Sequence, residues 1–333
     1  MGGEALTAEV SRAFWLSACL TVILGFWLVP LLRQLRVGQR IRTDGPARHL
    51  VKAGTPTMGG ITFLGGMTVA VLSLARHQPD GIVVLLVALA YGLIGFLDDF
   101  LKIIKGRSLG LRAREKLLAQ VLVAAGLAWW ACAFAGRGTD YVLPFSGFWE
   151  VGGVRFDLGF LFFFFFTILV LVSSANALNL TDGLDGLAAT LTAIAAGFYV
   201  FIALVVDKVG VAVALAAVVG GCLGFLVFNR HPAKVFMGDT GSLALGGALG
   251  AAAVLTRTEL FLPVIGAVFV AETLSVILQV VSFRLTGRRI WRMSPLHHHY
   301  ELKGWSENKV VLIFAFWGIV AGILGLSGLY RLG

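Results

Sequence analysis

Long apolar runs, separated by short polar stretches, dominate the pattern along this chain of 333 residues. About 20 mostly apolar residues cross the hydrocarbon core of a bilayer, so each run is a candidate membrane-spanning helix. Ten runs qualify, at residues 14–32, 58–74, 81–97, 117–135, 160–178, 187–205, 209–228, 242–254, 260–281 and 310–329. We therefore predict an all-α polytopic membrane protein with about ten transmembrane helices, forming a single integral-membrane domain over residues 1–333. The run at 242–254 is short and rich in glycine, so it is the least typical of the ten.

Composition agrees with this pattern and excludes a soluble globular enzyme. Hydrophobic residues make up 58% of the chain and charged residues 14%, whereas a soluble domain is about 45–50% apolar and about 25% charged. The 42 glycines suit close packing of helices in lipid. The three cysteines lie far apart within apolar runs, so they predict neither a disulfide framework nor a zinc site.

The basic residues predict the orientation of the helices, because Lys and Arg concentrate in cytoplasmic loops. Of the 27 Lys and Arg residues, all but seven follow the first, third, fifth, seventh or ninth run. The seven exceptions are Arg12, Arg76, Arg137, Arg155, Lys208, Arg257 and Arg331. We therefore expect those five loops in the cytoplasm and both termini outside. The net charge of +9 then reflects topology and anionic lipid head groups, and no nucleic-acid partner is expected.

One outer loop has a pattern of its own. Residues 136–158 alternate apolar and polar positions between glycine turns, which is typical of a β-hairpin. We expect a small outer β-hairpin near residues 138–157.

Acidic residues mark the cytoplasmic end of the third run, in the segment LDDFLK. A carboxylate at a membrane boundary is unfavourable unless it is paired or solvated. Asp98 and Asp99 therefore indicate either a functional site or a solvated helix end whose acids pair with Lys102 and Lys105. Adjacent helix residues point about 100° apart, which makes one shared metal difficult for this pair alone.

A second polar segment, NALNLTDGLDGLA, places Asn176, Asn179, Asp182 and Asp185 at every third position. On a helix this spacing forms one slanting stripe of amides and carboxylates. Because the loop contains no Lys or Arg, we expect a divalent cation, or the hydroxyl and N–H groups of a ligand, to balance the two carboxylates.

A third segment, FMGDTGSLALGG, puts Asp239 among small residues just before the eighth run. A carboxylate at a helix N-terminus suits a hard cation and phosphate oxygens, although an aspartate in that place is also a common helix cap. Phe236 lies near the water boundary, where its ring could stack on a nucleobase.

Two further segments are basic or rich in histidine. MSPLHHHYELKGWSE follows four arginines and contains His297, His298 and His299, which suit a diphosphate or peptide carboxylates; the arginines could equally contact lipid head groups. KAGTPTMGG carries Lys52 and Thr57 and could be either part of the site or an ordinary basic loop.

These segments resemble the phospho-N-acetylmuramoyl-pentapeptide transferases, within the superfamily of polyprenyl-phosphate N-acetylhexosamine-1-phosphate transferases. Their order, their spacing and the predicted topology resemble that family too, so the resemblance covers essentially the whole chain. The acidic segments are shared across the superfamily, whereas GTPTMGG and SPLHHHYELKGWSE are typical of this branch. Tyr300 stands where Phe is usual.

The resemblance implies transfer of phospho-N-acetylmuramoyl-pentapeptide from its UDP-linked precursor to undecaprenyl phosphate. The products are lipid I and UMP, in the first membrane step of peptidoglycan synthesis. It further implies Mg²⁺ as cofactor, a homodimer, and a multi-pass location in the bacterial inner (cytoplasmic) membrane with the active site on the cytoplasmic side.

The resemblance also implies roles for individual residues. Asp239 would bind Mg²⁺, with Asp182 as a second candidate ligand. Asp98 would act as a base or position the lipid phosphate, with Asp99 beside it, and His297 would act in catalysis at the sugar diphosphate. The substrate-binding residues would be Lys52, Thr57, Lys102, Lys116, Asn176, Asn179, Asp182, Asp185, Phe236 and His298, with Gln120 as a further candidate.

Elementary chemistry favours a direct mechanism. A phosphate monoester has a second pKa of about 6, so the lipid phosphate is already anionic near pH 7 and hardly needs a strong base. Asp98 then matters more for placement. A covalent aspartyl-phosphate route is the alternative.

Three other functions are compatible with parts of the pattern. A related transferase could deliver N-acetylglucosamine-1-phosphate to the same lipid. An anion transporter would place charges near the bilayer midplane, where Glu272 is the main candidate; we expect Glu272 to pack against a polar partner or to lie beside a helix break. A flippase or assembly partner would leave the acidic clusters unexplained.

Overall fold

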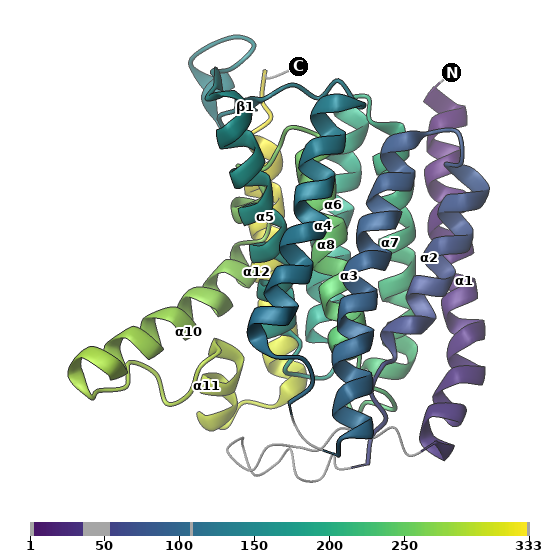
Figure 1. The fold of residues 1–333 in the computed structure, drawn as a ribbon, viewed down its shortest axis with the longest axis vertical. Coiled ribbons are helices and arrows are strands. Elements are labelled where there is room, and N and C mark those ends of the chain that lie inside the picture. Colours follow the sequence, from purple (N-terminus) through teal and green to yellow (C-terminus); the bar gives the residue numbers. More distant parts are fainter. Residues whose placement is uncertain (1–2, 36–53, 107–108, 332–333) are drawn as a thin grey trace.

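Helices provide nearly all the regular structure in the computed structural model, which describes residues 3–35, 54–106 and 109–331 (Figure 1). In chain order these helices are α1 (Gly3–Gln34), α2 (Gly60–Leu74), α3 (Pro79–Ile104), α4 (Ala113–Ala133), α5 (Gly159–Thr181), α6 (Leu187–Val205), α7 (Val209–Asn229), α8 (Gly238–Leu255), α9 (Leu262–Ile265), α10 (Ala267–Thr286), α11 (Leu296–Leu302) and α12 (Glu307–Ser327). The two strands are β1 (Asp140–Val142) and β2 (Arg155–Asp157), with a 3₁₀ turn η2 (Ser146–Phe148) between them.

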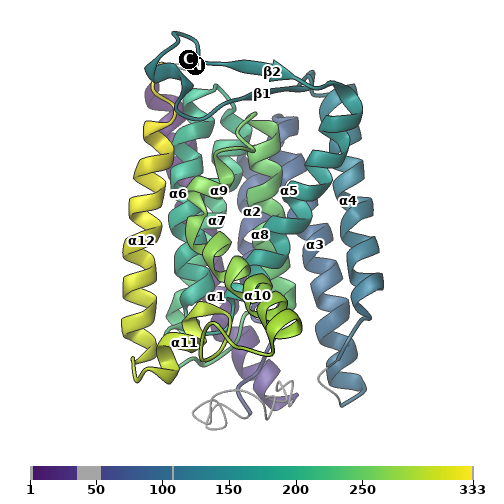
Figure 2. The ribbon, with the colours of Figure 1, turned by 90° about the vertical axis from the view of Figure 1, so that its left-hand side faces the viewer.

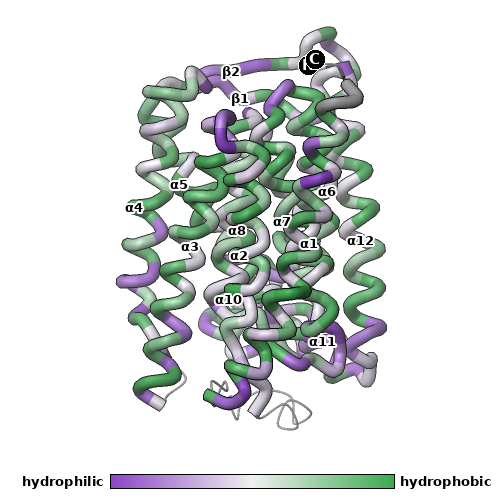
Figure 3. Tube along the Cα trace, turned by 90° about the vertical axis from the view of Figure 1, so that its right-hand side faces the viewer, coloured by the Kyte–Doolittle hydropathy of each residue, from purple (hydrophilic) through white to green (hydrophobic). Residues whose placement is uncertain are grey.

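Eight helices within the described residues are long and apolar enough to cross a membrane, namely α1, α3, α4, α5, α6, α7, α10 and α12. The predicted all-α polytopic architecture is therefore confirmed. The other two predicted spans also form helices, α2 and α8, but α2 has only 15 residues. Hydrophobic residues predominate along the middle of the helices, and hydrophilic residues are more frequent toward the two ends of the bundle (Figure 3).

Helix α8 forms the centre of the bundle. All of its residues from Thr240 to Leu255 are buried, and it packs against α3 and α5 along much of its length. Because most of these residues are Gly, Ala, Ser or Thr, neighbouring backbones can approach closely. The short glycine-rich run that was the least typical of the predicted spans is thus the innermost helix.

The expectation of one continuous span at 260–281 is wrong. The helix is interrupted at Gly266, which ends α9 and precedes α10. Helix α10 then leaves the bundle at a steep angle and carries α11 with it (Figure 1). Only one stripe of α10 is buried, formed by Phe269, Glu272, Ser275 and Gln279. Its spacing of three to four residues is that of a single helix face.

The predicted outer hairpin is present. Strands β1 and β2 pair antiparallel, with Tyr141 opposite Phe156, and both chain ends lie at the same end of the bundle as this hairpin (Figures 1 and 2). Below it the buried guanidinium of Arg137 pairs with Glu259 and donates to the carbonyl oxygens of Asp140 and Val254. This contact fastens the hairpin to the loop between α8 and α9.

Candidate active site

Three carboxylates meet at the opposite end of the bundle from the hairpin. Asp98 and Asp99 of α3 lie with Asp239 of α8 so that one oxygen of each falls within 4.8 Å of the others. Lys102 stands among them, with its Nζ 2.6 Å from Asp98 Oδ2 and 3.1 Å from Asp239 Oδ2. The two aspartates that point apart on α3 therefore converge once a second helix, α8, supplies Asp239 as their partner.

Close approach of α3 to the first turn of α8 makes this convergence possible. A Cβ atom added to Gly95 would lie 2.1 Å from the carbonyl oxygen of Asp239, so only glycine fits there. One turn further along α3, Asp99 Oδ2 accepts hydrogen bonds from the backbone N–H and the hydroxyl of Thr240, at 3.0 and 2.8 Å. Asp99 thus holds the first turn of α8 in place.

Helices α4 and α5 complete the surroundings of Asp239. Lys116 Nζ lies 2.7 Å from Asp239 Oδ2. Asn179 donates from its amide to Asp239 Oδ1 and to the Ser242 hydroxyl, each at 2.9 Å. One carboxylate therefore receives donors from three helices, α3, α4 and α5, which ties down its position in the bundle.

The remaining members of the asparagine–aspartate stripe take separate places. Asn176 donates to Gln120 Oε1 at 2.6 Å, away from the carboxylates. Asp182 follows the last residue of α5. Burial, together with nearby carboxylates, Asp239 foremost, raises the pKa of Asp182 well above its ordinary value. The carboxyl group of Asp182 therefore interacts electrostatically with the carboxylates of the central cluster.

Asp185 belongs to a second cluster. Its Oδ2 lies 2.9 Å from His231 Nδ1 and accepts from the backbone N–H of Ala233 at 3.1 Å. Glu307, in the first turn of α12, has Oε2 3.5 Å from the same His231 nitrogen. Sequence reasoning did not single out His231 or Glu307, since each is far from Asp185 in the chain and lies in an unremarkable loop or helix start.

The histidine segment forms a third group. His297 is fully buried and contacts Glu272 of α10, so the polar partner and the nearby helix break that we expected for Glu272 are both present. His298 Nδ1 lies 2.8 Å from Glu301 Oε2. The ring of His297 lies against Gly183, next to Asp182, because a Cβ added to Gly183 would be 2.2 Å from His297 Nε2.

The glycine–threonine segment packs beneath the central cluster. Backbone hydrogen bonds join Gly59 to Phe236 and Phe236 to Pro56. Thr57 is buried there, and Phe236 is half-buried close to the start of α8. Lys52, the other residue expected from this segment, lies outside the described residues.

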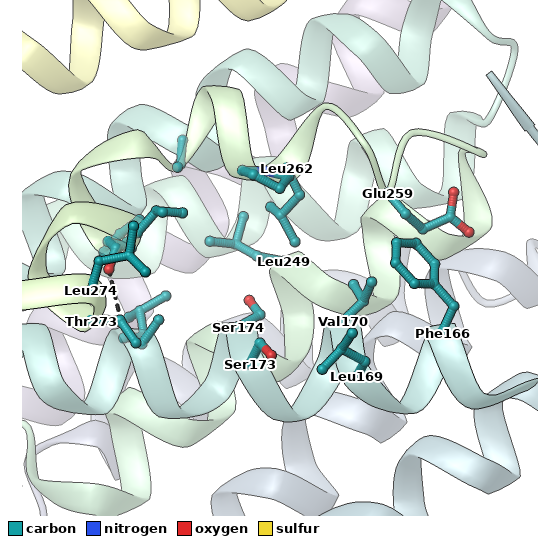
Figure 4. A pocket seen from close by; sticks show the side chains of 17 residues that line it. Phe166, Leu169, Val170, Ser173, Ser174, Leu249, Glu259, Leu262, Thr273 and Leu274 are labelled. Atoms are coloured by element: carbon teal, nitrogen blue, oxygen red, sulfur yellow. Dashed lines mark hydrogen bonds between the residues drawn. The ribbon is translucent and has the colours of Figure 1, made fainter. Parts of the chain in front are cut away.

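An apolar cavity of about 290 Å³ borders the same helix that carries Asn176 and Asn179 (Figure 4). Its walls come from α5, α8, α9 and α10, among them Leu169, Leu249 and Leu262. It extends from Leu178, beside the asparagine stripe, toward Glu259 at the outer end. Helix α5, which contributes Asn179 to the carboxylate site, thus also lines a space suited to an apolar chain.

Among the residues that the structure describes, two sets of side chains could hold a cation. Asp98, Asp99 and Asp239 offer only oxygen ligands, which hard cations such as Mg²⁺ prefer. Asp185, His231 and Glu307 add an imidazole nitrogen, which suits softer metals better. The first set is therefore the candidate centre for phosphate chemistry.

The fold and this arrangement define a polytopic membrane transferase, and residues 81–257, more than half of the chain, match the family described as Glycosyl transferase family 4. Nearly the whole chain is similar to curated enzymes named phospho-N-acetylmuramoyl-pentapeptide-transferase. Identity is 58% over 320 residues with that of Desulforudis audaxviator, covering 94% of this chain and 96% of the relative. With that of Pelotomaculum thermopropionicum it is 60% over 320 residues, covering 96% and 98%. The chain belongs to the phospho-N-acetylmuramoyl-pentapeptide-transferase family.

Proposed function

We propose that this enzyme transfers phospho-N-acetylmuramoyl-pentapeptide from its UDP-linked precursor to undecaprenyl phosphate. An oxygen of the lipid phosphate attacks the β-phosphorus of the nucleotide sugar, and the bond from that phosphorus to the bridging oxygen breaks. UMP leaves with the bridging oxygen, and the product is lipid I. The observation that carries this proposal is the meeting of Asp98, Asp239, Lys102 and Lys116 at one end of a membrane bundle, beside an apolar cavity.

The cluster supplies what phosphoryl transfer requires, which is mainly positioning and neutralisation of charge. Asp98, Asp99 and Asp239 would hold Mg²⁺, since their oxygens fit the ligand preference of that ion. When bound, Mg²⁺ would neutralise phosphate charge. Lys102 and Lys116 would contact phosphate oxygens as point charges. Asp182 is a further candidate ligand.

Direct attack fits the roles of the two adjacent aspartates. Asp98 accepts from the backbone N–H of Leu111 at 2.8 Å and pairs with Lys102. Held in this way, its carboxylate would position the lipid phosphate. Asp99 is committed to Thr240. Neither contact leaves an aspartate free to act as a nucleophile. We therefore favour direct attack by the lipid phosphate over a route through an aspartyl-phosphate intermediate.

The nucleotide sugar would lie between the clusters. Asn176, Asn179, Asp185 and Phe236 would line the nucleoside side, with Thr57 and Lys52 nearby. His297 and His298 would face the sugar diphosphate. Support for this arrangement comes from two contacts of the described residues: the ring of His297 lies against Gly183, and the backbone of Phe236 bonds to Pro56 and Gly59, on either side of Thr57.

The surroundings of the site support the proposed lipid partner and the proposed location. The apolar cavity is lined by α5 and α10 and could receive part of an isoprenoid chain. The concentration of basic residues in the loops at this end supports a cytoplasmic face in the bacterial inner membrane. A homodimer is part of the proposal on the family resemblance alone.

The closest competing function is transfer of N-acetylglucosamine-1-phosphate to the same lipid. Purified enzyme would be supplied with undecaprenyl phosphate, Mg²⁺ and either UDP-N-acetylmuramoyl-pentapeptide or UDP-N-acetylglucosamine, and UMP release would be measured. We expect release with the first nucleotide sugar and at least a hundredfold less with the second. Equal or reversed rates would assign the enzyme to the other branch.

A further inference from the structure

Glu272 is a carboxylate with no exposed surface, placed in the membrane-spanning helix α10. Its contact is His297, which is also fully buried. Since a buried carboxylate in an apolar helix is unfavourable, its retention calls for a specific partner or task. Glu272 takes no part in the central cluster, because the side chains that contact Asp239 come from α3, α4 and α5, whereas Glu272 lies on α10.

A single oxygen of Glu272 holds His297 at two points. Oε1 lies 3.2 Å from the backbone nitrogen of His297 and 3.1 Å from its ring Nδ1. The backbone N–H can only donate, so Oε1 faces His297 as an acceptor. A carboxylate likewise only accepts, and therefore Nδ1 carries the ring proton. The two contacts fix both the orientation of the ring and its tautomer.

In the neutral imidazole the other ring nitrogen, Nε2, is then an acceptor. His297 Nε2 is buried and has no hydrogen-bond partner among the residues that the structure describes. It lies against the backbone of Gly183, in the loop between Asp182 and Asp185. A buried polar atom without a partner is unfavourable, which indicates that a ligand supplies the missing donor.

We propose that Glu272 is a positioning residue that holds His297 so that Nε2 accepts a hydrogen bond from the nucleotide-sugar substrate. The donor is a hydroxyl or amide N–H of the sugar or its peptide, next to the loop at 182–186. This inference rests on the proposed function, since that function supplies the substrate. A purely structural contact that only fastens α10 to α11 is the alternative.

The variants follow from the geometry. Glu272→Gln keeps an oxygen that can accept from both N–H groups, so it is the conservative control. Glu272→Leu removes the acceptor and releases the ring. His297→Phe removes Nε2 itself. UMP release would give kcat and KM for the wild type, these three variants and the double variant E272L/H297F.

We expect E272Q to keep kcat/KM within threefold of wild type, and E272L to lose tenfold or more. The double variant should be no worse than H297F within twofold, because Glu272 acts only through His297. The proposal would be overturned if the losses in kcat/KM of E272L and H297F multiplied in the double variant. It would also be overturned if E272Q were folded but as inactive as E272L. A merely structural Glu272–His297 contact predicts the same coupling of the two losses, so the ¹⁵N measurement on added nucleotide sugar separates the two roles.

A second readout does not depend on turnover. Ring ¹⁵N chemical shifts of His297 in the full-length protein report which nitrogen is protonated. We expect the Nδ1–H tautomer in wild type and E272Q, its loss in E272L, and a shift of Nε2 when UDP-N-acetylmuramoyl-pentapeptide is added without lipid. The wrong tautomer, or an Nε2 signal unmoved by a bound nucleotide sugar, would contradict the proposal. Absence of UMP release from wild type with an intact tautomer would instead count against the proposed function.

Discussion

Lys116 Nζ lies 2.7 Å from Asp239 Oδ2, and Lys102 Nζ lies 3.1 Å from the same oxygen. Two ammonium groups from different helices thus share one carboxylate oxygen. Each of them repels a divalent cation that approaches Asp239, and each is placed to meet a phosphate. On the proposed function, the two lysines would therefore set the balance between binding the metal and binding the substrate.

This balance predicts an unusual pair of effects for Lys116→Gln. Loss of one positive charge should lower the Mg²⁺ concentration that gives half-maximal UMP release, while kcat falls at least tenfold for lack of a phosphate contact. The matched control is Lys105→Gln, since Lys105 is exposed at the same end of α3. A Mg²⁺ titration of activity measures both quantities. An unchanged half-maximal concentration with an unchanged kcat would remove Lys116 from the site.

The two adjacent aspartates should separate in their effects on stability and activity. Asp99→Leu leaves the N–H and the hydroxyl of Thr240 without an acceptor, which costs about 1–3 kcal/mol. Asp98→Asn keeps an oxygen for the Leu111 N–H but loses the charge that pairs with Lys102. Thermal unfolding in detergent should show a lower melting temperature for the first variant only. UMP release should fall at least tenfold in both variants, since both carboxylates would hold Mg²⁺, so only Asp98→Asn should lose activity without losing stability. A melting temperature lowered in Asp98→Asn and unchanged in Asp99→Leu would refute these roles.

Much of this architecture could be predicted from the chain because lipid imposes long apolar runs. Those runs predicted the helices. Their order along the chain predicted which polar loops lie together on one side of the membrane. A helix break near Glu272 was one of two expectations, but its position at Gly266 was not predicted, since the apolar run continues through it. The His231 contact with Asp185 was also missed, because the two residues come from separate loops and only the packed bundle brings them together. Glu272 stood out by its charge, yet only the fold identifies His297 as its partner.

Close packing of α3 on α8 predicts a severe effect for a very small substitution. Gly95→Ala places a methyl group 2.1 Å from the backbone oxygen of Asp239, where no flexible side chain can yield. Overpacking of this kind typically costs about 1–3 kcal/mol, and it should also displace Asp239 and lower UMP release. Gly126→Ala is the matched control, because nothing described lies within 4 Å of its added Cβ. Equal melting temperatures and rates for the two variants would contradict the close approach.

The Arg137–Glu259 pair predicts a pH dependence of stability at the hairpin end. Burial outweighs the attraction of Arg137 and raises the pKa of Glu259 from 4.5 to about 7. The folded state therefore binds a proton that the unfolded state has lost between about pH 4.5 and 7. This group's contribution to the free energy of unfolding falls as pH rises through that window and levels off above it.

Glu259→Gln cannot titrate and should lack that slope, so the melting temperature of the wild type relative to the variant should fall from pH 5 to pH 7. Thermal unfolding at several pH values in one detergent measures this difference. A difference that rises with pH would mean that Arg137 dominates and keeps Glu259 ionised.

The carboxylate of Asp239 is the most direct test of the whole account, because three helices direct donors to it. UMP release from UDP-N-acetylmuramoyl-pentapeptide and undecaprenyl phosphate would be compared for wild type and Asp239→Asn at saturating Mg²⁺. The loss of one preorganised charge at a phosphoryl-transfer site predicts a fall of roughly 10²–10³-fold in kcat, with the melting temperature close to that of wild type. Wild-type turnover in a folded D239N enzyme would show that the chemistry takes place elsewhere.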